Sequence, residues 1–170
     1  IHAAARDGDV ELVQGFLQEQ AAVDLRDNGG ATPLIIAFAN GHEACVRVLL
    51  DGGADINASH KSKTMALIMA AQNGHAARRE GHFDVLQLLL QRGADVHQKD
   101  DAGDNALIMA CMRGHTTCVA ALLDAGADYH ASGRNAAGYT ALHRASMCGR
   151  FDAMELLLKR GADPDATRLD

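Results

Sequence analysis

A pattern of about 33 residues repeats along the chain and constrains its fold more than any other feature. The stretch Leu49–Asp55 (LLDGGAD) returns at Leu89–Asp95, Leu122–Asp128 and Leu157–Asp163, and Gln20 begins a degenerate first copy. The copies are spaced 33, 40, 33 and 35 residues apart. Periods in this range are typical of solenoids, in which each unit packs only against its neighbours. The sequence therefore predicts an open row of about five units.

A second landmark in the same register indicates that each unit is a pair of helices. Leucine opens an apolar segment and glycine follows seven residues later at Leu34–Gly41, Leu67–Gly74, Leu107–Gly114 and Leu142–Gly149. Residues that favour helix fill these segments, and a second amphipathic segment follows each glycine. We therefore expect a single domain over residues 1–170, with helix pairs at about 1–19, 32–52, 66–92, 106–125 and 140–160.

Small side chains occupy one equivalent position in the first helix of four units. This position holds Ala37, Ala70, Ala110 and Ala145. A methyl group there lets neighbouring helices approach closely, whereas a larger side chain would push the units apart. We therefore expect these alanines to be buried between stacked units.

Two units are longer than the others. Seven extra residues near 76–82 enter between the two helices of the third unit, and two more enter near Gly133. Loop-closure entropy tolerates insertions of this size at small cost. The longer insertion is open to two interpretations, a protrusion that contacts a partner or a neutral solvated loop.

The motifs that recur in phase are those of a known family. They include Gly30–Leu34 (GATPL), the Gly-Ala-Asp corners described above, and the Gly-His turns at Gly41 and Gly114. On these motifs the chain resembles the ankyrin repeat family over essentially its whole length. The resemblance implies an all-α solenoid with β-turn fingers, and a concave face of fingertips and first helices that binds other proteins.

The chain departs from the family at the tetrapeptide that begins each first helix. No copy of Thr-Pro-Leu-His is complete, and Met65 and Asn105 stand where the threonine is expected. In the family that threonine and the histidine tie the finger to the helix. We therefore expect the units beginning at Met65 and Asn105 to hold their fingers less rigidly, by about 1 kcal/mol each.

The histidines and cysteines favour structural roles over a metal site. Four histidines lie in Gly-His turns, where an imidazole can bridge backbone groups of neighbouring units, namely His42, His75, His82 and His115. The four cysteines form no C-x-x-C pair, and a chain this rich in aliphatic residues does not need disulfides. We therefore expect reduced thiols, a cytoplasmic or nuclear location, and neither a metal nor another cofactor.

Charge and hydropathy exclude further classes of function. The formal net charge is −6, and no block of Lys and Arg is long enough to follow a phosphate backbone. The longest apolar stretch, Met65–Ala71, is far shorter than a membrane span. The nearest catalytic candidates, Cys148 and His143, are five positions apart, which turns their side chains away from each other on a short helix. We therefore expect no nucleic-acid partner, no membrane insertion and no enzymatic activity.

The resemblance also indicates which residues line the binding groove. In the family, these are the residues before each Gly-His turn and those beside the fingertip glycine. Later units carry the apolar, aromatic and guanidinium groups that dominate binding energy. The acidic residues Asp100, Asp101 and Asp104 are open to two interpretations, selection of a basic peptide or a solvated acidic turn. The predicted partner-binding residues are Asn40, Gln72, Asn73, Asp101, Asp104, Met112, Arg113, Tyr139 and Met147.

The function expected on these grounds is a non-enzymatic scaffold for protein–protein interaction. We expect the chain to be a monomer by itself. We also expect it to be the recognition or regulatory part of a larger polypeptide, because neither end resembles the polar cap of an isolated array. An alternative is an accessory region of an enzyme whose catalytic domain lies elsewhere. Another is a hydroxylase substrate, since Asn57 resembles the family's target for asparaginyl hydroxylation; the competing interpretation is an asparagine that bonds the finger backbone.

Overall fold

The computed structural model describes residues 1–60, 66–73, 81–130 and 138–165, and in these ranges it contains ten helices and no strands. The helices are α1 (His2–Asp7), α2 (Val10–Gln18), α3 (Pro33–Ala39), α4 (Glu43–Asp51), α5 (Ala66–Asn73), α6 (Gly81–Gln91), α7 (Ala106–Arg113), α8 (Thr116–Asp124), α9 (Ala141–Met147) and α10 (Phe151–Lys159). No helix in these ranges combines the length and the apolar character needed to cross a membrane. Most of the insertion predicted near 76–82, and the one near Gly133, lie outside the described residues.

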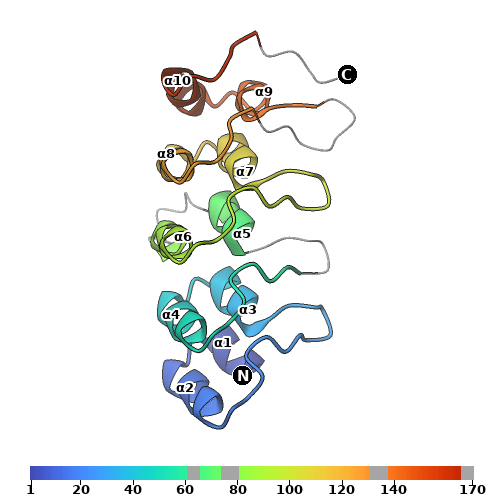
Figure 1. The fold of residues 1–170 in the computed structure, drawn as a ribbon, viewed down its shortest axis with the longest axis vertical. Helices are drawn as coiled ribbons and strands as arrows, with labels where there is room; N and C mark the ends of the chain where they lie inside the picture. Colours follow the sequence, from blue (N-terminus) through green and yellow to red (C-terminus); the bar gives the residue numbers. More distant parts are fainter. Residues whose placement is uncertain (61–65, 74–80, 131–137, 166–170) are drawn as a thin grey trace.

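The helices form two parallel layers that extend along one axis (Figure 1). The first helices of the pairs make an inner layer of α1, α3, α5, α7 and α9, and the second helices make an outer layer. Each helix packs on its partner in the pair and on the equivalent helix of the next unit. The fingers project beside the inner layer, away from the outer layer. This arrangement confirms the all-α solenoid that the repeat predicted.

Side chains cap the inner helices where the fingers end. Thr32 Oγ1 accepts from the backbone N–H of Ile35 at 3.4 Å, and Thr140 caps α9 in the same way. Asn105 Oδ1 accepts from the N–H of Ile108 at 2.9 Å. The asparagine amide therefore supplies the cap that threonine gives elsewhere, and the looser finger expected at this unit stays a prediction. Met65 lies outside the described residues.

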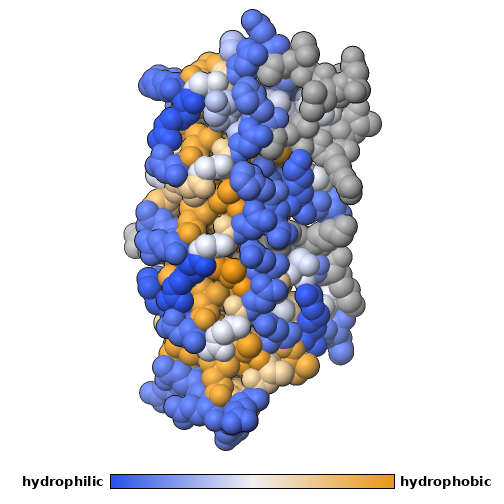
Figure 2. All heavy atoms as spheres, in the orientation of Figure 1, coloured by the Kyte–Doolittle hydropathy of each residue, from blue (hydrophilic) through white to orange (hydrophobic). Residues whose placement is uncertain are grey.

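The core is a continuous row of small and aliphatic side chains between the two layers. The four equivalent alanines, Ala37, Ala70, Ala110 and Ala145, are fully buried, as predicted. Leucines and valines of the outer helices pack against them, with Leu49, Leu89, Leu122 and Leu157 also fully buried. On the face drawn in Figure 2, apolar residues that reach the surface form a band along the long axis, flanked by hydrophilic residues. The row gives neighbouring units a shared core instead of one central core.

The fingers are hydrogen-bonded turns with the same pattern in different units. In one finger, the N–H of Asp27 donates to the carbonyl of Ala31, and the Asp27 carboxylate accepts from the N–H of Ala31, both at 2.9 Å. Asp100 and Asp104 repeat both bonds in the third finger, at 3.0 and 2.9 Å. Each aspartate therefore closes its own turn, as expected of an Asx-type turn.

Hydrogen bonds also link consecutive units at the base of the fingers. The Asp24 carboxylate accepts from the N–H of Asp55 at 3.0 Å, and Asn57 Oδ1 accepts from the N–H of Asp95 at the same distance. Asp24 and Asn57 occupy equivalent positions one repeat apart. The side chain of Asn57 therefore bonds the finger backbone, in agreement with the structural interpretation of this residue.

The predicted role of the Gly-His turns is confirmed for His42 and His115, while the side chains of His75 and His82 lie outside what the structure describes. Nε2 of His42 lies 2.9 Å from the carbonyl oxygen of Arg6, and Nε2 of His115 lies 3.1 Å from that of Gln72. Each imidazole thus reaches back from the start of an outer helix to the end of the preceding inner helix. These bridges tie adjacent units together on the side of the array where the paired helices are joined.

The four cysteines are free thiols. Cys45, Cys111 and Cys118 are buried in the core, and Cys148 is exposed. Burial raises the pKa of Cys111 to about 12 and that of Cys118 to about 11. The buried thiols are therefore protonated at neutral pH and act as small apolar side chains.

Candidate partner-binding groove

An open pocket of about 380 Å³ lies where the inner helices α1, α3 and α5 meet the fingers. Ala31, Ile35, Ile36, Ala39 and Met69 provide its apolar lining. An apolar surface bordered by a few polar groups is typical of a site that receives an apolar side chain from a ligand. The pocket follows from the stacking, since its lining comes from three consecutive units.

The polar rim of this pocket consists of Arg6, Asn40, His60 and Gln72. Nδ2 of Asn40 donates to the carbonyl of Ile36 at 2.8 Å, which fixes the amide and leaves its oxygen as an acceptor. Gln72 is half-buried on α5, and its side-chain amide has no hydrogen-bond partner within the described ranges. Two of the predicted partner-binding residues, Asn40 and Gln72, thus lie together at one pocket.

The predicted residues of the fourth and fifth units lie on a separate part of the surface. Tyr139 is half-buried at the start of the fifth unit, and its ring centroid lies 5.8 Å from that of His143. The Arg144 guanidinium carbon lies 5.8 Å from the same tyrosine centroid, within range of a cation–π contact. Met112 is half-buried against the core, whereas Met147 is 64% exposed.

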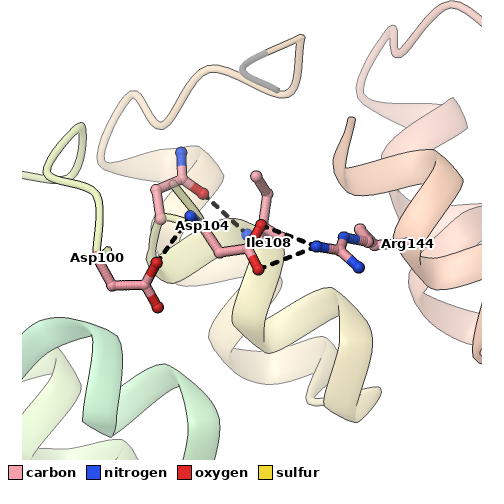
Figure 3. A network of polar contacts seen from close by, with 5 residues as sticks. Asp100, Asp104, Ile108 and Arg144 are labelled. Atoms are coloured by element: carbon pink, nitrogen blue, oxygen red, sulfur yellow. Dashed lines mark hydrogen bonds and ion pairs between the residues drawn. The ribbon is translucent and has the colours of Figure 1, made fainter. Parts of the chain in front are cut away.

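The acidic residues of the third finger divide between solvent and the interior. Asp101 is exposed, but Asp104 is 5% exposed and pairs with Arg144 of the next inner helix. Both Asp104 oxygens accept from Arg144 Nη2, at 3.2 and 3.1 Å (Figure 3). Burial raises the pKa of Asp104, and the Arg144 guanidinium acts in the opposite direction. Asp104 therefore joins two units of the array and is not accessible to a partner peptide.

Two further predicted residues, Arg113 and Asn73, stand at the ends of inner helices. Arg113 ends α7, is exposed, and lines a different hollow between the fourth and fifth units. Asn73 ends α5, and its side chain lies outside what the structure describes.

Sequence reasoning missed most of the apolar lining of the pocket. Ile36, Met69 and Met109 stand at one repeat position, two residues after the landmark leucine. Ile36 and Met69 line the pocket, and Met109 is partly buried against the core on α7. This position was predictable in principle, because apolar residues recur there in three units. The place of Arg6 and His60 at the pocket depends on how the units stack, and no sequence pattern indicates it.

Within the described ranges, the structure gives no arrangement for metal or acid–base chemistry. No group of three or more His, Cys, Asp and Glu side chains there could hold a metal ion. Nδ1 of His143 lies 2.8 Å from Thr140 Oγ1 in the cap of α9. Cys148 is the C-cap at the other end of that helix. The imidazole is therefore engaged in a structural contact and is not placed to activate the thiol.

Comparison with known proteins gives the same pattern of repeats. A family model described as "Ankyrin repeats (3 copies)" matches residues 1–78 and 75–168. Among curated relatives, inversin from Danio rerio is 39% identical over 75 residues, which are 44% of this chain and 7% of inversin. "Ankyrin repeat and KH domain-containing protein 1" from Homo sapiens is 42% identical over 74 residues, 42% of this chain and 3% of that protein.

A third relative is "E3 ubiquitin-protein ligase KEG" from Arabidopsis thaliana. It is 42% identical over 57 residues, which are 33% of this chain and 4% of that protein. The chain therefore matches only a small part of the length of each of these relatives.

Proposed function

The chain belongs to the ankyrin repeat family, and on that premise we propose that it is a non-enzymatic scaffold that binds a segment of a protein partner in the groove between the inner helices and the fingers. Ankyrin repeats generally mediate protein–protein interaction, and the relatives contain them as regions of larger proteins. The same setting is proposed here, with the chain as a recognition part of a larger polypeptide.

The observation that carries this proposal is the apolar pocket at Ile36 and Met69. The pocket opens to solvent on the face that the inner helices share with the fingers, where Met69 is half-buried and Ile36 is 7% exposed. The amides of Asn40 and Gln72 stand at its edge, where they can bond the backbone of an extended segment. An apolar anchor surrounded by polar contacts is the usual anatomy of a protein-binding site.

The remaining parts of the proposal follow from the same features. Three buried free thiols suit a reducing compartment, so we propose an intracellular location. The array buries its core between neighbouring units, so we propose that the chain acts as a monomer. A role without catalysis is supported by the engagement of His143 in the α9 cap.

The similarity to a ubiquitin-protein ligase favours a second candidate function. In that case the array would be an accessory region of an enzyme and would bring a protein to its catalytic domain. Hydroxylation of Asn57 stays a prediction. Asn57 Oδ1 bonds the N–H of Asp95, so a hydroxylase would require this finger to open first.

We expect Met69→Glu to abolish binding of peptides selected from a display library against the wild-type chain. A carboxylate in the apolar lining would have to be desolvated by any bound apolar side chain, which costs more than the anchor contributes. Leu158→Glu is the matched control, because it makes the same change at an exposed leucine of α10 outside the groove. Binding is measured by fluorescence anisotropy and folding by circular dichroism. Equal affinity of the selected peptides for both variants would contradict the proposal that they bind in the groove.

We expect Tyr139→Ala to weaken the binding of a partner that spans the later units by about 1 kcal/mol or more, which is roughly fivefold in Kd. The half-buried ring provides contact area at small entropic cost and packs beside Arg144. Tyr139→Phe is the control that retains the ring. Isothermal titration measures the affinity and thermal melting reports the fold. An unchanged Kd for the alanine variant would remove Tyr139 from the binding surface.

A further inference from the structure

The fifth unit replaces the bridging histidine with arginine. Arg150 follows Gly149 just as His42 and His115 follow their glycines. Nε of Arg150 donates to the carbonyl of Met112 at 3.1 Å, so the side chain makes the same backward bridge. The bridge needs only one N–H donor. A guanidinium has four further N–H donors and a permanent positive charge. The substitution therefore adds cationic hydrogen-bond donors where other units have an imidazole.

A glycine in the preceding unit makes room for this bridge. A Cβ at Gly114 would lie 2.9 Å from Arg150 Cδ, and Gly114 has a φ of +78°. The arrangement repeats at the first turn, where a Cβ at Gly8 would lie 2.6 Å from Nδ1 of His42. Because each bridging side chain lies across a glycine of the preceding unit, Arg150 is held close to the turn that contains Arg113.

Arg113 brings a second cation to the same place. It stands immediately before Gly114, at the position occupied by Asn40 and Asn73 in earlier units. Arg113 and Arg150 line one hollow of about 260 Å³ between the turns of the fourth and fifth units. This hollow lies at the end of α7 remote from its finger, since the finger precedes the first residue of that helix. It shares no lining residue with the pocket at Met69, which is formed by the first three units.

Neither arginine is neutralised within the described part of the chain. Four other arginines there each form an ion pair with a carboxylate, namely Arg47, Arg92, Arg144 and Arg160. Asp152 also lines the hollow, but it is not within ion-pair distance of Arg113 or Arg150. It lies in the first turn of α10, where a carboxylate is favoured by the helix dipole. The two guanidinium groups therefore leave local positive charge on a chain with a net charge of −6.

Two exposed apolar side chains stand on either side of the turn at Gly149, and one of them lines the hollow. Phe151 is 77% exposed and lines the hollow itself, at the position where other units have Glu43 and Thr116. Met147 is 64% exposed on the other side of the same turn. These are the two most exposed large apolar side chains of the described residues. Arginine, phenylalanine and methionine are enriched in protein interfaces, whereas exposed phenylalanine is uncommon on a solvated surface.

We propose that the turns of the fourth and fifth units bind an acidic segment of a protein partner. Carboxylates of that segment accept hydrogen bonds from the terminal nitrogens of Arg113 and Arg150, in the geometry that guanidinium groups favour. An apolar side chain beside those carboxylates covers Phe151. A short acidic segment neutralises the two guanidinium charges. The long phosphate backbone of a nucleic acid would instead be repelled by the net negative charge of the rest of the protein. The acidic-segment site goes beyond the groove proposal, and either proposal can fail alone because the two hollows share no lining residue.

The test uses substitutions that the chain itself contains at equivalent positions. Arg150→His restores the imidazole bridge of other units, and Arg113→Asn restores their asparagine. The probe is a fluorescein-labelled peptide of alternating glutamate and leucine residues. We expect the double variant to bind this probe at least about tenfold more weakly than the wild type, with the same melting temperature. The control variant Arg92→Gln/Lys159→Gln makes the same change in net charge elsewhere and is expected to retain affinity within about twofold.

Several outcomes would overturn the acidic-segment site. These are failure of the wild-type chain to bind the probe, an equal loss in the control variant, or tighter binding of a lysine–leucine peptide. Displacement of the probe by equimolar inorganic phosphate would assign a simple anion site instead. Tighter binding of a single-stranded oligonucleotide would assign a nucleic-acid surface. Phe151→Ser, added to the double variant, is expected to weaken binding of the probe further. An unchanged affinity would show that Phe151 does not contact the bound segment. Peptides selected for the groove are expected to bind the double variant normally, which separates this test from that of the groove.

Discussion

Replacing Leu107 with alanine is expected to lower the free energy of unfolding by about 2–5 kcal/mol. Leu107 is fully buried in α7, which packs against α5, α8 and α9. The substitution leaves a cavity at a point where three units share their core, and the short helices on either side have little freedom to collapse into it. The loss is measured by urea denaturation followed by far-UV circular dichroism.

Leu142→Ala is the matched control for this prediction. Leu142 stands at the same repeat position, but it is half-buried in the last unit of the described chain. Leu142→Ala is expected to lower the free energy of unfolding clearly less than Leu107→Ala, because fewer surrounding atoms lose a contact. The central substitution is also expected to broaden the unfolding transition, since it weakens the coupling between the two halves of the row. Equal losses for Leu107 and Leu142 would contradict a core that is shared between neighbours.

The architecture was predictable because its signals are local and repeated. Each unit carries its own landmark leucine, buried alanine and turn glycine, so one unit read correctly fixes the register of the next. The burial of Ala110 and the bridge made by His115 both follow from position in the repeat. The cap of α7 was not predicted, because Asn105 was compared with the family's threonine and not with the general chemistry of N-caps.

The candidate sites were less predictable because they depend on pairs of residues in different units. Asp104 belongs to an acidic run in the sequence, but the stacking brings Arg144, forty residues later, against it. Arg113 was predicted as a groove residue, and its actual neighbour is Arg150 of the next turn. A repeat pattern gives the position of each side chain within a unit. The distance between side chains of different units follows only from the stacked coordinates.

Replacing Arg144 with methionine is expected to destabilise the array by about 3 kcal/mol near pH 7. The change leaves the carboxylate of Asp104, whose side chain is 7% exposed, without its cationic partner (Figure 3). An uncompensated buried charge costs far more than the net contribution of the intact pair. Methionine has a similar length and stands at this repeat position as Met69 and Met109, so the fold accommodates it.

The pH dependence of this variant has a definite sign. Burial raises the pKa of Asp104 above its ordinary value of 3.8, and Arg144 opposes that rise. Without Arg144 the folded-state pKa is expected to rise further. A carboxyl with a raised folded-state pKa loses stability as pH increases from the unfolded value through the folded value. The destabilisation of Arg144→Met is therefore expected to be largest near pH 7 and to shrink as the pH approaches about 4.

Adding Asp104→Asn to the Arg144→Met variant separates the charge from the packing. The double variant retains the shape of the side chain and has no carboxyl to titrate at position 104. It is expected to regain much of the stability lost near pH 7 and to lose the extra pH dependence. Thermal melting of the wild type and both variants across this pH range measures the effect. A loss that is the same at both pH values would show that Arg144 stabilises the fifth unit through its contacts with Tyr139 and the finger, and not by neutralising Asp104.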